Sequence, residues 1–418
     1  MKIKLCVLFG GKSVEHEVSI ISALQAVASL DTSKYDIIPV YITKNSEFYT
    51  SFECSCIEEY KNIPALLKKS QRCVLMNIDG RVKLMRFPFK RFGNNVISDI
   101  DVAFPIVHGT NVEDGTLQGY LKTLGLPFVG CDVTSSAVGM DKYVMKTVLK
   151  DNDVPVLDCL RFIASDFAEP DKLIAKTKEK IGFPAIVKPV NLGSSVGISV
   201  AHDEEGLRKS LDDAFKFATV VLVERAITDL TEINCSVCGD VDEAYASECE
   251  QPAKADEILS YKDKYLQGGG SKKTGGAKTG AKTGGAKSGS SKGGMASLAR
   301  KIPADISPER REEIRSMAVK AFKVLGCNGV SRIDFMIDGE TDKVYLNEIN
   351  TIPGSLSFYL WEPVGVPYTK LLDRMIELAL KRKREEDSIV FSFESNILSG
   401  NFSFGRGRKG GKLGGKLN

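Results

Sequence analysis

The sequence predicts an α/β protein of two or three domains whose N-terminal part is built around a parallel sheet. The chain has 418 residues, which is too many for one small hydrophobic core. Its first segment alternates an apolar strand at residues 4–9, an amphipathic helix from 15 to about 30, and a strand at 36–42. A strand–helix–strand order of this kind is typical of parallel pairing.

The composition is that of a globular protein, with 43% hydrophobic and 27% charged residues. A net charge of +3 indicates no polyanionic partner. No apolar run approaches the length of a membrane span, and the start runs into Gly10-Gly11 without a cleavage site, which favours a first strand over a signal peptide. We therefore expect a cytoplasmic location, no membrane association, and ten reduced cysteines.

The remaining elements follow the same α/β style. Residues 102–107 form a strand that ends at His108-Gly109, residues 114–125 form a helix closed by glycine, and residues 45–98 have no clear pattern. Beyond residue 131 the expected helices are 134–151, 170–181, 308–325 and 368–384. The expected strands are 156–163, 185–188, 197–201, 220–224, 232–238, 243–250, 330–337 and 343–350.

The last two strands form a hairpin with one polar and one apolar face. A register centred on residue 341 pairs Asp334 with Glu348 and Arg332 with Asn350, and period-two geometry puts these four side chains on one face. Carboxylate and amide oxygens suit Mg²⁺ bound with nucleotide phosphates, and Arg332 is placed to clamp a carboxylate or phosphate. The alternative is an exposed face with solvated charges. The opposite face suits a core, with Ile333, Phe335, Leu346 and Ile349.

A glycine- and serine-rich loop at residues 193–197 follows Lys188 and lies between two expected strands. Backbone N–H groups in such loops bind phosphate oxygens, and Lys188 would point at the same charge. The spacing differs from a Walker loop, and the loop alone could be an ordinary hairpin turn. Together with the carboxylate face, it predicts a nucleotide held between two sheets.

Six motifs stand in order along the chain: Leu8-Phe-Gly-Gly11-Lys-Ser-Val-Glu15-His-Glu-Val-Ser19, His108-Gly…Glu113-Asp-Gly-Thr-Leu-Gln-Gly119, Val187-Lys188-Pro…Gly193-Ser-Ser-Val-Gly197, Val223-Glu224-Arg225, Arg332-Ile-Asp334 and Asn347-Glu348-Ile-Asn350-Thr-Ile-Pro-Gly354. In this order they resemble the D-alanine–D-alanine ligase family of the ATP-grasp fold. The resemblance covers residues 1–385 apart from 268–294. It implies a three-domain ATP-grasp architecture, with an N-terminal parallel-sheet domain at 1–131 and two α+β domains at 132–224 and 225–385 that enclose ATP.

The resemblance implies a reaction and its cofactors. ATP would phosphorylate the carboxylate of one D-alanine, and the amine of a second D-alanine would attack the acyl phosphate, giving a dipeptide for peptidoglycan precursors. Two Mg²⁺ ions, with Mn²⁺ as a substitute, would neutralise the transferring charge. The family also implies a homodimer and no specific nucleic-acid partner.

The resemblance also implies which residues bind substrate. Glu15, supported by Ser194 and Tyr265, would hold the ammonium of the first D-alanine, although a helix first-turn acid is the ordinary interpretation of Glu15. His108 would join this site, and a satisfied core histidine is its alternative. Arg332 and the backbone at Gly354 would receive the second D-alanine's carboxylate and the developing oxyanion, beside Tyr359.

The nucleotide and metal ligands follow from the same resemblance. ATP would be bound by Lys142, Lys188, Ser194, Ser195, Glu224, Arg225, Ile227, Glu232 and Lys264. Glu224, Arg225 and Ile227 would contact adenine, and Glu232 the ribose. The metal ligands would be Asp334, Glu348 and Asn350.

Two tyrosines bear on the acceptor. Tyr265 stands where the branch of the family that makes D-alanyl-D-lactate tends to have histidine, which favours an amine acceptor. Tyr359 stands where the family usually presents a small hydroxyl residue. D-serine or another small D-amino acid therefore remains open as the acceptor, with D-lactate a further alternative.

The stretch 268–294 is rich in glycine and lysine and expands the expected lid. We expect a tolerated loop insertion, with anion binding as the alternative, and a disordered basic tail at 386–418. Two other functions stay open: an ATP-grasp ligase for a different acid and amine, and a non-enzymatic anion-binding protein with a vestigial core. The intact metal face, Lys188 and Glu15 argue against the last.

Overall fold

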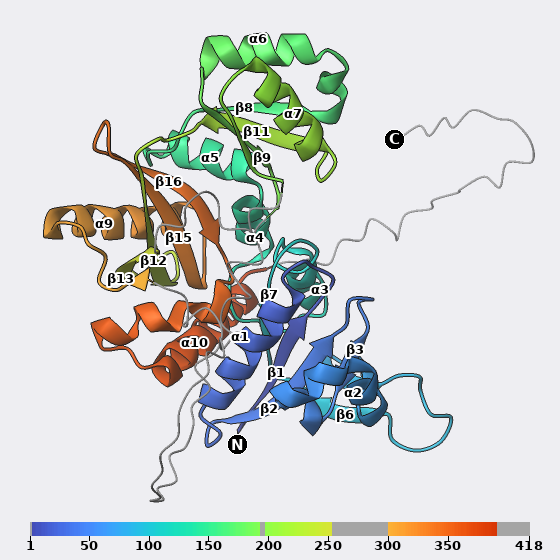
Figure 1. Cartoon of the computed structure of the whole chain (residues 1–418). Helices are drawn as coiled ribbons and strands as arrows, with labels where there is room; N and C mark the ends of the chain where they lie inside the picture. The colour runs from blue at the N-terminus through green and yellow to red at the C-terminus, as the bar shows by residue number, and fades with distance from the viewer. Residues whose placement is uncertain (1, 193–196, 253–299, 391–418) are drawn as a thin grey trace, which may run out of the picture.

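The computed structural model describes residues 2–192, 197–252 and 300–390. Within these residues three sheets, each with its own helices, form three lobes (Figure 1). The expected loop residues Ser194 and Ser195, the residues Lys264 and Tyr265, and the insert 268–294 lie outside the described part. None of the described helices is long and apolar enough to cross a membrane.

The first sheet has the strand order β6-β5-β4-β3-β2-β1-β7. As expected, β1 (Ile3–Gly10) runs parallel to β2 (Tyr35–Ile42) and β7 (Val102–Val107), with α1 (His16–Ser29) as a crossover. The unassigned segment 45–98 adds four antiparallel strands, so the sheet is mixed. A two-residue turn between two of these strands permits only antiparallel neighbours. The added elements are β3 (Phe48–Thr50), α2 (Ile63–Lys69), β4 (Gln71–Ile78), β5 (Arg81–Arg86) and β6 (Val96–Asp99).

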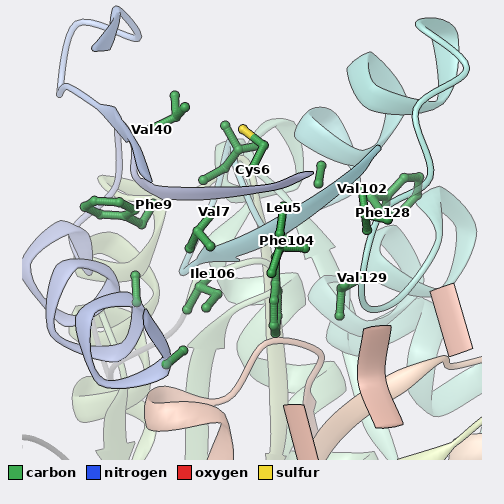
Figure 2. Close-up of a cluster of buried hydrophobic side chains, with 14 of the residues drawn as sticks. Leu5, Cys6, Val7, Phe9, Val40, Val102, Phe104, Ile106, Phe128 and Val129 are labelled. Carbon is green, nitrogen blue, oxygen red and sulfur yellow. The ribbon is translucent and has the colours of Figure 1, made fainter. Parts of the chain in front are cut away.

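The strands at the centre of this sheet are buried on both faces. Figure 2 shows Cys6 and Val40 on one side of β1, with Val7, Phe104 and Ile106 on the other. All five are at most 1% exposed. Burial on both faces explains why β1 and β7 are continuous apolar runs in the sequence. The carboxyl end of β1 leads into the turn at Gly10-Gly11, and that of β7 leads into the loop at His108-Gly109.

The second lobe follows α3 (Thr116–Thr123) and two short helices, α4 (Val133–Met140) and α5 (Lys142–Asp151). Asp141 separates these helices and caps α5, because its side chain accepts the backbone N–H of Tyr143 and Val144. The sheet order is β10-β9-β11-β8, and α7 was not expected from the sequence. The elements are β8 (Cys159–Ile163), α6 (Pro170–Lys180), β9 (Ala185–Pro189), β10 (Ser199–Ala201), α7 (Glu204–Phe215) and β11 (Val220–Arg225).

The third sheet has the order β14-β13-β12-β15-β16. Helix α9 (Pro308–Val324) packs on β13 and β12. Helix α10 (Tyr368–Asp387) instead joins the hydrophobic core of the first sheet, and it continues past residue 386, where the tail was expected to begin. The strands are β12 (Leu230–Gly239), β13 (Ala244–Pro252), β14 (Arg300–Lys301), β15 (Gly329–Asp338) and β16 (Lys343–Asn350).

The β15–β16 hairpin has the predicted register at its four polar site residues. Asp334 pairs with Glu348 and Arg332 with Asn350. A bulge between Asp334 and Phe335 leaves Asn347 as the extra residue of β16, because Phe335 pairs with Leu346. The bulge explains the apolar face, whose members Ile333, Phe335, Leu346 and Ile349 all belong to one buried cluster.

Candidate active site

Polar side chains form two rows across the third sheet. Strand pairing aligns Glu250, Asn234, Asp334 and Glu348 across β13, β12, β15 and β16. The neighbouring row aligns Ser236, Arg332 and Asn350. Because both rows have the same parity along their strands, they share one face of the sheet. The sequence predicted the hairpin half of this face but missed Glu250, Asn234 and Ser236.

The centre of the face is a tight cluster around Asp334. Arg332 donates from Nε and Nη2 to the two oxygens of Asp334, at 2.7 Å each, and Asn350 Nδ2 donates to Oδ2 at 3.1 Å. Burial raises the pKa of the Asp334 carboxyl, as do the charges of Glu348 and Glu250, whereas Arg332 lowers it. A divalent cation would offset both unfavourable influences on the carboxylate.

The candidate ligands fit Mg²⁺ by their chemistry. They are two carboxylates and one amide, all hard oxygen donors on adjacent strands. In the described ranges there is no group of three or more His, Cys, Asp or Glu side chains arranged for a metal. A site built here would therefore depend on the Asn350 oxygen and on phosphate oxygens to complete the coordination.

Lys142 connects three parts of the site. It is the first residue of α5, and its Nζ lies 3.2 Å from Glu348 Oε2 and donates to the backbone oxygen of Leu192 at 3.1 Å. Leu192 directly precedes the glycine-rich loop. Lys142 is 6% exposed, so it is not the solvated helical lysine that its position alone would suggest.

Lys188 approaches the hairpin from the second sheet. Its Nζ donates to Asn347 Oδ1 at 3.2 Å and lies 3.2 Å from Glu224 Oε2. Lys146 Nζ lies 3.2 Å from the same oxygen. Burial would raise the pKa of Glu224, but Lys188 and Lys146 hold it below its ordinary value. Glu224 is fully buried, and its carboxylate pairs with both Lys188 and Lys146. It therefore holds the two lysines in place.

Lys146 and Asn347 were not among the predicted site residues. Burial lowers the pKa of Lys146, although Glu224 opposes this shift. The sequence did contain a signal for Lys146. It stands four residues after Lys142, so both lysines share one face of a helix. The position of Asn347 depends on the β-bulge, which the alternating pattern of the hairpin did not reveal.

The expected adenine and ribose residues lie where the second sheet passes into the third. Arg225 ends β11 and donates from Nη2 to Asp338 Oδ2 at 2.7 Å, which ties the two sheets together. Ile227 is half-buried in the connection that follows, and Glu232 is exposed on β12. These three residues thus stand one after another where the chain passes from β11 into β12, directly after Glu224.

The N-terminal lobe contributes Glu15 and the turn around it. Ser13 Oγ donates to the backbone oxygen of His108 at 2.6 Å and accepts the Glu15 N–H at 3.1 Å. Gly109 has a φ of +84°, and a Cβ there would lie 3.1 Å from Ser13 Cβ and 3.4 Å from Glu15 Oε2. Only glycine fits this approach without strain. A cavity of about 560 Å³ opens beside this turn and reaches Asn191.

His108 is buried and has both ring nitrogens bonded. Nδ1 lies 2.7 Å from the Ile352 carbonyl and must donate to it, so Nε2 accepts from Ser22 Oγ at 3.1 Å. Ser22 Oγ in turn accepts the Ser355 N–H at 2.8 Å. Burial lowers the pKa of His108 to about 4, and Arg332 acts in the same direction. His108 is thus a neutral, fixed residue that joins two lobes.

Glu113 adds a second link between the same two lobes. Its Oε1 accepts the Ile352 N–H at 2.8 Å and the Thr351 hydroxyl at 3.3 Å, and its Oε2 accepts the Gly109 N–H at 3.0 Å. Burial raises its pKa to about 7, and the charge of Glu15 acts in the same direction. The Glu15 loop is therefore held against the segment that directly follows the hairpin.

The chain after Gly354 takes an unusual path. Ser355, Leu356 and Ser357 all have left-handed φ angles, between 50° and 53°. Such angles cost non-glycine residues about 1–2 kcal/mol each. The turn brings Tyr359 to the sheet, where its hydroxyl donates to Glu250 Oε1 at 3.2 Å.

Fold and face together define a class of protein. Lys142, which begins a helix beside the second sheet, reaches the Glu348 carboxylate on the third sheet, and Lys188 on the second sheet reaches the Asn347 amide there. This is the arrangement of an ATP-grasp enzyme.

Family models describe the particular group. The model for the D-ala D-ala ligase N-terminus matches residues 4–131, and that for the C-terminus matches 148–282 and 292–377. The chain belongs to the D-alanine–D-alanine ligase family.

Individual relatives agree. The chain is 35% identical over 396 residues to the D-alanine–D-alanine ligase of Thermosipho melanesiensis, covering 95% of this chain and 98% of the relative. It is 38% identical to that of a Thermoanaerobacter species, covering 92% and 98%.

Two solved structures have the same fold. The D-alanine–D-alanine ligase from Coxiella burnetii matches with a TM-score of 0.74 and 29% identity, over 92% of this chain and 96% of that one. The VanG D-Ala:D-Ser ligase from Enterococcus faecalis matches with a TM-score of 0.72 and 28% identity, over 91% and 100%. The two names differ in the acceptor.

Proposed function

We propose that this protein joins two D-alanines at the expense of ATP, giving D-alanyl-D-alanine for peptidoglycan precursors. ATP phosphorylates the donor carboxylate, the acceptor amine attacks the acyl phosphate, and the products are the dipeptide, ADP and phosphate. The observation that supports this most strongly is the meeting of Lys142 and Lys188 with Glu348 and Asn347, since two cations and hard oxygen donors converge where phosphates would lie.

The lysines and the hairpin would divide the work on the nucleotide. Lys142 and Lys188 would hold the phosphates, with Glu224 fixing Lys188 from behind. Asp334, Glu348 and Asn350 would hold two Mg²⁺ ions, with Mn²⁺ as a substitute. Bound there, the ions would supply positive charge against the negative charge of the transferring phosphate. Ser194, Ser195 and Lys264 would complete the phosphate site, and the nucleoside site would consist of Glu224, Arg225, Ile227 and Glu232.

The substrate residues would act from two lobes. Glu15, with Ser194 and Tyr265, would bind the donor ammonium. His108 is too firmly bonded to exchange protons at neutral pH, so we assign it a positioning role: it holds the Ile352 carbonyl and, through Ser22, the Ser355 N–H. Arg332 and the Gly354 backbone would receive the acceptor carboxylate and the oxyanion.

Three further features belong to the same proposal. We propose a homodimer, from the family resemblance, and a cytoplasmic location, because the reaction consumes ATP. We also retain the division into domains at 1–131, 132–224 and 225–385.

The test is phosphate release from ATP across a panel of acceptors. Purified protein is incubated with Mg²⁺, ATP and D-alanine, alone or with D-serine or D-lactate, and the products are identified by mass spectrometry. The proposal predicts release that depends on D-alanine and yields D-alanyl-D-alanine. Release with D-serine or D-lactate in preference to a second D-alanine would correct the acceptor, and absence of turnover with every D-amino acid would overturn the function.

A further inference from the structure

The row of polar residues continues past Asp334 to a buried ion pair. Glu250 is 3% exposed, and its Oε2 accepts from Arg300 Nη1 at 2.7 Å. Its Oε1 accepts from Asn234 Nδ2 at 2.9 Å and from the Tyr359 hydroxyl at 3.2 Å. Three donors on one buried carboxylate stabilise its charge and fix its position.

The same cluster holds the ring of Tyr359 in place. The Arg300 guanidinium lies over the ring, 4.1 Å from its centroid. Burial raises the pKa of Tyr359 to about 12, so its hydroxyl stays protonated and donates to Glu250. Tyr359 is thus fixed at its hydroxyl by Glu250 and across its ring by Arg300.

This cluster lies at the end of the face away from the phosphate-binding lysines. Adjacent strands are about 4.8 Å apart, so Glu250, two strands from Asp334 and three from Glu348, stands roughly 10 Å and 14 Å from them. Lys142 contacts Glu348 at the opposite end. Arg332 lies between, and its charge reaches Tyr359, since it lowers the pKa that burial raises.

The left-handed turn at Ser355–Ser357 supports a functional position for this ring. Three consecutive non-glycine residues have positive φ, and backbone strain of this kind persists where the surroundings fix the structure. The strained turn places Tyr359 close enough to Arg332 for their charges to interact. A flexible wall at this point would not select among acceptors, whereas a clamped aromatic ring does.

We propose that Tyr359, clamped by Arg300 and Glu250, is the wall of the acceptor site that limits the acceptor to a small side chain. An acceptor whose carboxylate is bound by Arg332 would meet this ring on the side away from the phosphates. Tyr359 is the specificity-determining residue, and Glu250 and Arg300 are positioning residues. The inference rests on the proposed ligase function, because it concerns the second substrate of that reaction.

The test compares acceptors of different size in the wild-type protein and in Tyr359→Ala. D-alanine and D-norvaline compete as acceptors, and fragmentation of the dipeptide by mass spectrometry shows which residue is C-terminal. Fitting two extra methylenes against a rigid wall changes selectivity by at least about 10-fold. We expect Tyr359→Ala to raise the D-norvaline to D-alanine ratio of kcat/KM by at least about 10-fold at the C-terminal position only.

Other variants separate the ring from its hydroxyl and from its clamp. Tyr359→Phe keeps the ring and should retain the wild-type ratio, whereas Tyr359→Leu should shift it in the same direction as alanine and preserve more of the buried volume. Glu250→Gln removes the charge that holds Arg300, and it should raise KM for the acceptor while KM for ATP stays unchanged. The matched control is Tyr245→Ala, an exposed tyrosine on the same strand as Glu250.

The outcomes distinguish this inference from the proposed function. If the wild-type protein forms no D-alanyl dipeptide, both the proposed function and the inference about Tyr359 are wrong. If the wild type forms the dipeptide but Tyr359→Ala and Tyr359→Leu, both folded by circular dichroism, keep the wild-type ratio, only the inference is overturned. A shift that appears equally at the N-terminal position of the dipeptide also contradicts it.

Discussion

Glu348 joins the candidate metal site to the candidate phosphate site. It lies opposite Asp334 across the hairpin and 3.2 Å from Lys142. Removing its charge while keeping its shape leaves Lys142 without its carboxylate partner and would leave a metal bound at this face with one anionic ligand fewer. The two effects act on the same step, because both weaken the binding of charge around the transferred phosphate.

Glu348→Gln should therefore lower kcat by at least about 100-fold, with the fold and the thermal midpoint preserved. Steady-state phosphate release measures kcat, and circular dichroism measures the fold and the thermal midpoint. Glu340→Gln is the matched control, since Glu340 lies exposed in the turn of the same hairpin. Activity of Glu348→Gln close to that of the control would refute the metal assignment.

His108 makes stability depend on pH. Its pKa falls from an ordinary value of about 6.5 to about 4 in the folded protein. Between these pH values the unfolded chain takes up a proton that the folded chain does not, so stability contributed by neutral His108 is present above pH 6.5 and lost as pH falls toward 4. The loss is on the order of 3 kcal/mol.

His108→Gln should show a smaller loss of unfolding free energy than the wild type between pH 6.5 and pH 4. Urea titrations across this range measure it. Glu113 acts in the opposite direction, because its raised pKa of about 7 costs stability as pH rises, so the difference between the two proteins is the informative quantity. His202→Gln, at an exposed histidine, should follow the wild-type profile. A slope for His108→Gln equal to that of the wild type would contradict this account.

At the scale of elements, the turn after the hairpin concentrates strain. Ser357 has a φ of 50°, is fully buried, and its hydroxyl has no hydrogen-bond partner in the structure as described. Ser357→Gly removes both the conformational cost and the unsatisfied hydroxyl, at the expense of greater freedom in the unfolded chain.

We expect Ser357→Gly to raise the free energy of unfolding by about 1 kcal/mol, as measured by urea denaturation. The contrasting control is Ser136→Gly, at a buried serine inside helix α4, where the same change should destabilise by about 1 kcal/mol. Equal destabilisation at both positions would show that the turn at Ser357 is not strained.

Some secondary-structure elements could be predicted from the sequence and others were missed. The β15–β16 register followed from period-two alternation around one turn. It is confirmed for the pairs Asp334–Glu348 and Arg332–Asn350, whereas the bulge shifts the pairing by one residue between there and the turn. The β4–β5 hairpin was missed although Asp79-Gly80, both with positive φ, is a strong two-residue turn signal. Helix α7 was not predicted, although Asp203 caps it by accepting the Gly206 N–H and two acidic residues stand in its first turn.

For the candidate site too, the sequence predicted the residues that lie in short motifs and missed the contacts between residues far apart in the chain. Residue types and spacing predicted Lys188 and the hairpin carboxylates, because they lie in short motifs. The Ser22–His108–Ser355 chain joins residues 86 and 333 positions apart, and the contacts of Glu250 with Tyr359 span 109. Contacts of that kind depend on how the lobes pack, which local patterns do not encode.

At the scale of the whole molecule, helix α10 joins the C-terminal part of the chain to the first sheet. Arg382 donates from Nη1 and Nη2 to the backbone oxygens of Gly130 and Phe128, at 2.7 Å and 2.5 Å, and its guanidinium lies 4.4 Å from the Phe128 ring centroid. These contacts fix the helix at the point where the first lobe leads into the second. The two lobes that hold Glu15 and Arg332 are thereby held together away from the site as well.

Arg382→Ala should lower the free energy of unfolding by about 2–3 kcal/mol, because it leaves two carbonyl oxygens without their charged donor. Lys383→Ala removes only a surface pair with Asp387 and should change stability by less than about 1 kcal/mol. Urea denaturation of both variants measures the difference. Equal stability of the two variants would contradict the anchoring role of Arg382.

We expect ligation to proceed through an acyl phosphate on the polar face of the third sheet. The most direct measurement uses D-alanine labelled with ¹⁸O in both carboxylate oxygens, followed by mass spectrometry of the released phosphate. Because phosphorylation of the donor carboxylate leaves one of its oxygens on the departing phosphate, we predict one ¹⁸O in each phosphate formed. Unlabelled phosphate, released while dipeptide accumulates, would contradict the account.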